Sequence, residues 1–290
     1  MARVAANVSL QLAMRTPMRN LSRTHNKYLY VSDMCALSAD EVLLSCGAAG
    51  LRSVSPHTAQ LAAHEPSAIR YVWRVVFDAH TDTLLLAVSA PTGNYYQLVS
   101  LRRNASEWLE VQRLSTRIHY NLYNIFNFVV CDSRVLLGDV GGNTLNVLDV
   151  SAEHTLRDVG NVTLQSGAYG VACTRRDGAT FVALSHFISV SLLLQLTSLP
   201  LRLVPLASVN LTAAHELLFL EDLLLVQLVK DDLNRATRSS HAIVSLRASD
   251  YALTEPRVLL NFPIDVWALA GDRLVLWDYN SQDLLVYTFT

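Results

Sequence analysis

Six positions along the chain carry polar or aromatic side chains that could bind a ligand. They are Asp33, Trp73, Asn127, Tyr169, His215 and Asp265. Each stands four residues before an apolar residue, and these apolar residues are Leu37, Phe77, Cys131, Cys173, Phe219 and Leu269. Carboxylate, amide and imidazole groups serve as ligands of calcium, magnesium or manganese, and two aromatic rings can bracket an organic molecule. If the six side chains meet, they form a metal or small-molecule site.

The elements that must bring these residues together are short β-strands. Apolar triplets recur about 42 to 51 residues apart, separated by clusters of Asp, Asn, Gly and Ser. The triplets begin at Val42, Leu84, Val135, Phe181, Leu223 and Leu274. A repeat of this length is typical of β-propellers, in which each repeat forms one blade.

The third repeat shows the internal pattern of a blade most clearly. Its predicted strands are Phe126–Cys131, Val135–Asp139, Leu145–Val150 and Val159–Leu164. Asp132-Ser133 and Gly141-Gly142-Asn143 separate the first three strands and favour tight hairpin turns. Four strands joined by such turns form one propeller blade.

These repeats predict an all-β fold, a single six-bladed β-propeller over residues 1–290, with seven blades as the alternative. The approximate blade ranges are 28–69, 70–117, 118–166, 167–211, 212–261 and 262–290. The last blade has only three predicted strands, so we expect the segment 1–27, through Val4–Ala13, to supply the fourth strand. The alternative for this segment is a mitochondrial presequence, because it carries five basic residues and no acid before Asp33.

In a propeller the first strand of each blade lies nearest the axis, so the six polar and aromatic residues would form a ring at the channel mouth. An offset of four residues keeps each on the same strand face as its apolar partner. Under the alternative interpretation, these side chains satisfy backbone groups at the strand ends. A shifted register would put Ser32, Arg74 and Glu216 into the ring.

Two segments resemble known propeller repeats. Residues 135–150, VLLGDVGGNTLNVLDV, resemble one blade of the YVTN/NHL-type propellers, and Leu274–Asp278, LVLWD, is similar to the end of a WD40-like repeat strand. The GH dipeptide of WD40 repeats is absent, and the Gly-Gly-Asn turn is not repeated. The resemblance implies the propeller fold and no particular active site.

Composition and the absence of known motifs argue against several classes of function. The 290 residues are 51% hydrophobic with a formal net charge of −2, which lacks the basic footprint of a nucleic-acid binder. No GxSxG, Walker A, GxGxxG, SxxK or HExxH motif is present.

Cys35, Cys46, Cys131 and Cys173 form no CxxC pair, so we expect reduced thiols and no zinc site. No transmembrane segment is expected. A cytoplasmic location is favoured, and mitochondrial or extracellular locations stay open.

Two hypotheses of function follow. The first is a noncatalytic propeller that acts as a scaffold for a protein partner, with no cofactor. The alternative is a ligand-binding propeller or a metal-dependent, lactonase-like hydrolase, with its site at the channel mouth and a divalent cation bound there. The ring of six residues is the feature on which the alternative depends.

Overall fold

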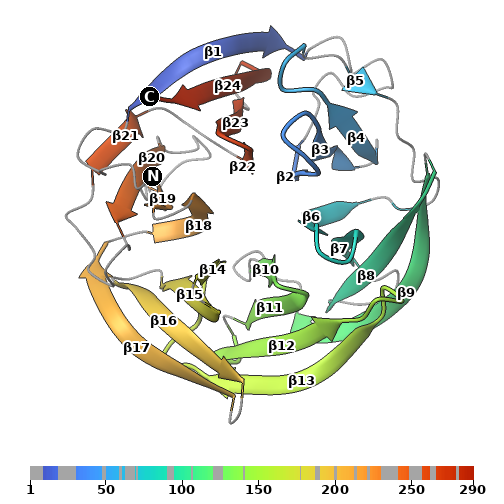
Figure 1. The fold of residues 1–290 in the computed structure, drawn as a ribbon, viewed down its shortest axis with the longest axis vertical. Coiled ribbons are helices and arrows are strands. Elements are labelled where there is room, and N and C mark those ends of the chain that lie inside the picture. The colour runs from blue at the N-terminus through green and yellow to red at the C-terminus, as the bar shows by residue number, and fades with distance from the viewer. Residues whose placement is uncertain are drawn as a thin grey trace. The chain divides into compact units, whose positions relative to one another are not determined.

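The computed structural model contains only β-strands among the regular elements of its described residues. These are 9–18, 31–47, 50–58, 61–62, 69, 71–89, 95–105, 107–119, 127–139, 141–176, 178–186, 190–198, 201–211, 214–220, 223–229, 241–247, 257–261, 266–278 and 281–290. The strands form six four-stranded antiparallel sheets, which confirms the all-β prediction (Figure 1). Among the described residues, no helix of a length and hydropathy suited to crossing a membrane occurs.

The described chain divides into two compact units of three sheets each. The first unit contains β10 (Asn127–Cys131), β11 (Arg134–Asp139), β12 (Thr144–Val150) and β13 (Leu156–Thr163) in one sheet. Its second sheet contains β14 (Gly170–Arg176), β15 (Ala179–Ser185), β16 (Val190–Ser198) and β17 (Leu201–Asn210). Its third contains β18 (Ala214–Leu220), β19 (Leu223–Val229), β20 (His241–Arg247) and β21 (Arg257–Asn261).

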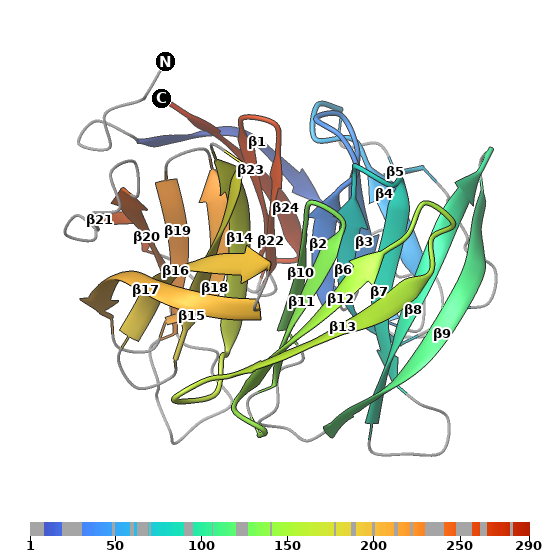
Figure 2. The same cartoon turned by 60° about the horizontal axis from the view of Figure 1, so that its bottom comes forward.

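The other unit holds the sheets built from the two ends of the chain. One sheet contains β2 (Asp33–Ala36), β3 (Val42–Ser45), β4 (Leu51–Val54) and β5 (Leu61–Ala62). The next contains β6 (Val72–Asp78), β7 (Thr83–Ser89) and the long pair β8 (Tyr95–Asn104) and β9 (Glu107–His119), visible in Figure 2. The last contains β22 (Val266–Ala270), β23 (Arg273–Asp278), β24 (Asp283–Phe289) and β1 (Leu10–Pro17).

The apolar triplets of the sequence all lie in the second strand of a sheet. Val42–Leu44, Leu84–Leu86 and Leu274–Leu276 are completely buried, and the other three triplets are almost as deeply buried. A strand with a sheet partner on each side and apolar side chains packed on both faces has no solvent-facing side, which explains the absence of alternation in these runs.

The predicted hairpin turns also occur where expected. Asp132 and Ser133 have φ values of 55° and 61°, the two positive φ angles of a type I′ turn between β10 and β11. At the next turn, the Asp139 carboxylate accepts a hydrogen bond of 3.0 Å from the N–H of Gly142. Both turns therefore have a local chemical cause that the sequence carries.

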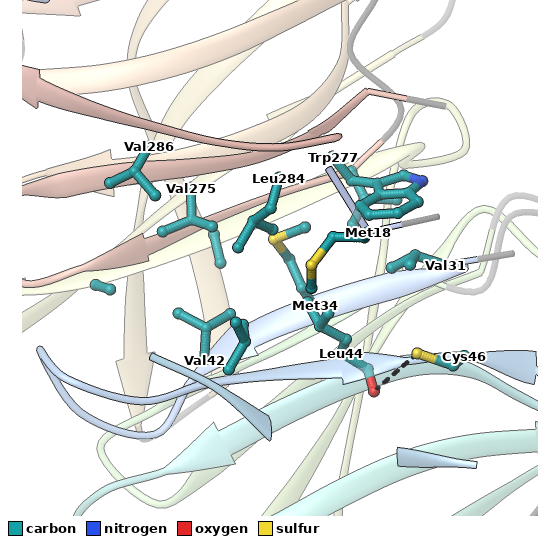
Figure 3. Packing of buried hydrophobic residues seen from close by; sticks show 14 residues of the cluster. Met18, Val31, Met34, Val42, Leu44, Cys46, Val275, Trp277, Leu284 and Val286 are labelled. Carbon is teal, nitrogen blue, oxygen red and sulfur yellow. Dashed lines mark hydrogen bonds between the residues drawn. The ribbon is translucent and has the colours of Figure 1, made fainter. Parts of the chain in front are cut away.

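Neighbouring sheets within each unit pack through shared apolar cores. The first strands of successive sheets contact one another, as β2 does with β6 and β22, and as β14 does with β10 and β18. In the core shared by the β2–β5 and β22–β24 sheets, the side chains of Met18 and Met34 gather near the ring of Trp277 (Figure 3). Adjacent sheets are thus held together mainly by burial of apolar side chains.

A strand from the N-terminal part of the chain completes the last sheet, as predicted. β1 pairs antiparallel with β24, from Leu10 opposite Phe289 to Pro17 opposite Asp283. Residues 4–8 of the predicted strand lie outside the described residues, and the observed strand continues past Ala13 to Pro17. The content of apolar residues did not locate the end of this strand, because β1 is an edge strand with several exposed side chains. One of its polar side chains, Arg15, pairs with the buried Asp283 carboxylate.

Gly138 in β11 leaves room for the backbone of the next sheet. A Cβ at this position would lie 3.0 Å from the carbonyl oxygen of Ala168 and 3.2 Å from Cγ2 of Val171. We therefore expect Gly138→Ala to lower the free energy of unfolding by about 1 to 3 kcal/mol, measured by urea denaturation. The matched control is Gly178→Ala, which has open space but a φ of +79° and tests backbone strain alone. An unchanged midpoint for Gly138→Ala would contradict this account of the close approach.

Candidate functional site

Asp33, the first of the six predicted site residues, is a buried link between two sheets. It begins β2 and is only 3% exposed. Its Oδ2 accepts a hydrogen bond of 2.7 Å from the N–H of Val75 in β6, and its Oδ1 lies 3.6 Å from Nη1 of Arg74. The carboxylate therefore satisfies a backbone donor of the neighbouring strand. This contact matches the alternative interpretation of the six residues.

The same region contains further polar links that the ring prediction did not include. The hydroxyls of Ser32 and Ser45 both donate to the carbonyl oxygen of Val72, at 2.6 and 2.8 Å. Cys35, two residues beyond Asp33, has a thiol pKa raised well above its usual value, chiefly by burial and next by the Asp33 charge. These contacts tie the start of β6 to the β2–β3 hairpin at several points.

Trp73 follows a different geometry because β6 contains a bulge. The pairing of β6 with β7 shifts between Val72 and Arg74, so Trp73 falls at the irregularity. The simple alternation used to place Trp73 on the same face as Phe77 does not hold across a bulge. Its indole Nε1 donates a hydrogen bond of 2.6 Å to the hydroxyl of Ser89 at the end of β7, and the ring is half-buried.

Asn127 repeats in the other unit the role that Asp33 has in its own. It begins β10, is 1% exposed, and its Nδ2 donates a hydrogen bond of 2.9 Å to the carbonyl oxygen of Tyr169, just before β14. Its Oδ1 is buried and has no hydrogen-bond partner among the described residues. Two predicted site residues, Asn127 and Tyr169, are thus brought into direct contact, through the Tyr169 backbone.

The last two predicted site residues cannot be placed in the same way. His215 lies in β18, where the pairing with β19 shifts between Ala214 and Leu217, and its side chain is outside the described part. Asp265 also lies outside the described residues. The convergence of all six side chains therefore stays a prediction. Among the described residues, no group of three or more His, Cys, Asp or Glu side chains is arranged to hold a metal ion.

Tyr71, Trp73 and Tyr95 form an aromatic edge that was not predicted from the sequence. β6 and β8 run in the same direction within their sheet, so Tyr71, directly before β6, and Tyr95, at the start of β8, lie at the same end of that sheet. Tyr71 is 60% exposed and Tyr95 is 39% exposed. Only the aromatic residue types could have signalled this edge, because exposure is not visible in the sequence.

Tyr71 also has an unusual backbone conformation. Its φ is +57°, a region that a bulky residue rarely adopts, and its N–H donates to the carbonyl oxygen of Gly47 at 3.2 Å. Such strain costs of the order of 1 to 3 kcal/mol and is concentrated at sites with a function. The aromatic edge therefore combines two exposed aromatic side chains with a strained backbone conformation at Tyr71.

Comparison with solved structures identifies the fold. The chain matches the PQQ-bound aldose sugar dehydrogenase of Streptomyces coelicolor with a TM-score of 0.64 at 12% identity, covering 98% of this chain and 99% of that one. It matches a putative glucose dehydrogenase of Thermus thermophilus with a TM-score of 0.63 at 10% identity, covering 98% and 100%. The WD40 propeller domain of Doa1 matches with a TM-score of 0.55 at 11% identity, covering 97% of each chain.

The protein is a β-propeller, as the sequence repeats predicted, with its N-terminal strand completing the last blade. No family model matches the chain, and no curated protein matches it. Because the similar structures include both dehydrogenases and a WD40 domain, the fold is compatible with an enzyme and with a noncatalytic protein.

Proposed function

We propose that this β-propeller is a noncatalytic scaffold that binds a protein partner through the aromatic edge of Tyr71, Trp73 and Tyr95. The observation that carries the proposal is Tyr71, an aromatic residue that is 60% exposed and held at a positive φ. Aromatic residues are enriched at protein interfaces and supply much of their binding energy.

The contacts of the candidate ligand residues favour this proposal over the ligand-binding alternative. Asp33 and Asn127 use their side chains to bond the backbone of the next strand, at 2.7 and 2.9 Å. A carboxylate that is already bound to an N–H group and close to a guanidinium has less capacity for a metal ion. In the aromatic edge, in contrast, Tyr71 is 60% exposed and Tyr95 is 39% exposed, beside the half-buried Trp73.

We expect Tyr71→Asn to reduce partner binding at least about tenfold, a loss typical of one interface hot-spot residue, without lowering stability. Asparagine adopts positive φ more easily than tyrosine, so the substitution removes the ring while relieving strain. The measurement is quantitative affinity capture from native lysate with wild-type and variant protein, with the urea midpoint measured in parallel.

The matched control is Val159→Ser, which removes an apolar side chain of 42% exposure from β13 in the other unit. Proteins captured equally by the wild type, Tyr71→Asn and Val159→Ser would not be partners of this edge. If the wild type captures no protein more strongly than Tyr71→Asn does, the proposal is wrong. A rise in melting temperature with calcium, magnesium or manganese would favour the metal-dependent alternative.

A further inference from the structure

Cys131 and Cys173 lie on neighbouring strands of adjacent sheets in the same unit. Cys131 is the last residue of β10, and Cys173 lies in the middle of β14, which contacts β10. Cys131 is buried and Cys173 is half-buried, and both are free cysteines. Their separation in the sequence predicted reduced thiols and gave no sign that the two lie on neighbouring strands.

Two polar contacts fix the register between these strands. Near their starts, Nδ2 of Asn127 donates to the carbonyl oxygen of Tyr169 at 2.9 Å. Beyond Cys131, the guanidinium of Arg175 forms an ion pair with the carboxylate of Asp132. The first link joins the start of β10 to the start of β14, and the second joins residues near the ends of the two strands. β10 and β14 therefore run in the same direction.

The position of the cysteines follows from this register. Cys131 comes four residues after Asn127, and Cys173 comes four residues after Tyr169. The pairing of β10 with β11 and of β14 with β15 shows no register shift, so no bulge disturbs this count. The two thiols accordingly lie side by side, between the Asn127 contact and the Asp132–Arg175 ion pair.

The electrostatics of Cys173 agree with this arrangement. Burial raises the pKa of its thiol well above the usual value, and a hydrogen bond with the Cys131 thiol raises it further. Burial likewise raises the pKa of Cys46 to about 12, but no other cysteine contributes there. Of the four cysteines, only Cys131 and Cys173 have a second thiol as a described neighbour.

We propose that Cys131 and Cys173 are an oxidation site, at which a small hydroperoxide converts the two thiols into a disulfide that joins adjacent blades. In the first step the sulfur of one thiol attacks an oxygen of hydrogen peroxide, an S–O bond forms and the O–O bond breaks. The thiol proton passes to the departing hydroxide, so a sulfenic acid and one water form. In the second step the other thiol attacks the sulfenic sulfur, the S–S bond forms, and a second water leaves. The two thiols lose two electrons and two protons, and hydrogen peroxide is reduced to two waters.

The test uses the full chain with Cys35→Ser and Cys46→Ser, which keeps only the proposed pair. The folded protein is treated with hydrogen peroxide, denatured in an alkylating reagent and digested. We expect both thiols to disappear together, a linked peptide pair lighter by about 2 Da than the two reduced peptides, and full recovery of both thiols with dithiothreitol. Phenylarsine oxide, which bridges adjacent thiols, is expected to bind once per chain and to block the oxidation.

Cys131→Ser and Cys173→Ser, each on the same background, are the matched single-thiol variants. In these, dimedone should trap a lasting sulfenic acid or the thiol should stay reduced, and phenylarsine oxide should not be retained. Circular dichroism checks that each variant is folded. If only one of the two variants folds, that variant alone serves as the control. A pair that stays reduced, that forms a disulfide only in denaturant, or that overoxidises without a linked peptide would overturn the proposal.

Discussion

Replacing Asp33 with alanine is expected to lower the free energy of unfolding by about 2 to 4 kcal/mol. The carboxylate is 3% exposed and accepts the N–H of Val75, a residue that is itself buried. Its removal leaves a buried backbone donor without this acceptor and takes a negative charge from beside Arg74, at 3.6 Å. Urea denaturation followed by circular dichroism measures the change.

Asp33→Asn is the matched control for this prediction. The amide keeps an oxygen that can accept the Val75 N–H, and asparagine already occupies the corresponding place at the start of β10. We therefore expect a smaller loss than for alanine, reflecting only the charge near Arg74. If alanine and asparagine were both neutral, the contact between β2 and β6 would have no structural role, and the ligand interpretation of Asp33 would gain support.

The second large effect is expected on deleting residues 1–17, which removes β1 from the last sheet. The deletion exposes the edge of β24 and takes Arg15 from the buried Asp283 carboxylate. Because several ladder hydrogen bonds are lost at about 0.5 to 1.5 kcal/mol each, we expect a loss of about 4 kcal/mol or more. An exposed strand edge also promotes association between chains.

The measurements are the yield of soluble protein, its size on a gel-filtration column and its urea midpoint. A synthetic peptide covering residues 9–18, added during refolding, is expected to restore the soluble monomer because it can pair with β24. Arg15→Ala provides a milder comparison, with an expected loss below about 1 kcal/mol, since an exposed arginine contributes little to an ion pair. A soluble, equally stable deletion variant would contradict the role assigned to β1.

The fold was predictable because its signals are local. Apolar triplets such as Leu84–Leu86 report strands buried on both faces, and Asp132-Ser133 reports a type I′ turn without any distant information. The existence of the N-terminal strand was predicted, but its boundaries were not, because an edge strand needs little apolar surface. Arg15 of β1 pairs with Asp283, which lies near the other end of the sequence, so this contact is not visible locally.

The candidate site was less predictable because its geometry depends on neighbouring sheets. Period-two alternation holds in β10 but is interrupted by the bulge at Trp73 in β6. The sequence shows that Asp33 is polar, yet whether it bonds a ligand or the N–H of Val75 depends on how closely β6 approaches. Tyr71 has no sequence signal for a positive φ, since neither glycine nor asparagine stands there.

The joining of β1 to β24 also bears on chain connectivity. Ser9, which directly precedes β1, and Thr290, which directly follows β24, exchange backbone hydrogen bonds of 3.0 and 2.9 Å. These two residues therefore lie side by side. A short glycine-serine linker could therefore connect Thr290 directly to Ser9. New termini could be opened at the Gly141–Asn143 turn, which lies between two strands of one sheet. The fold is accordingly suited to circular permutation, which changes the repeat at which the chain starts and keeps the cyclic order of the repeats.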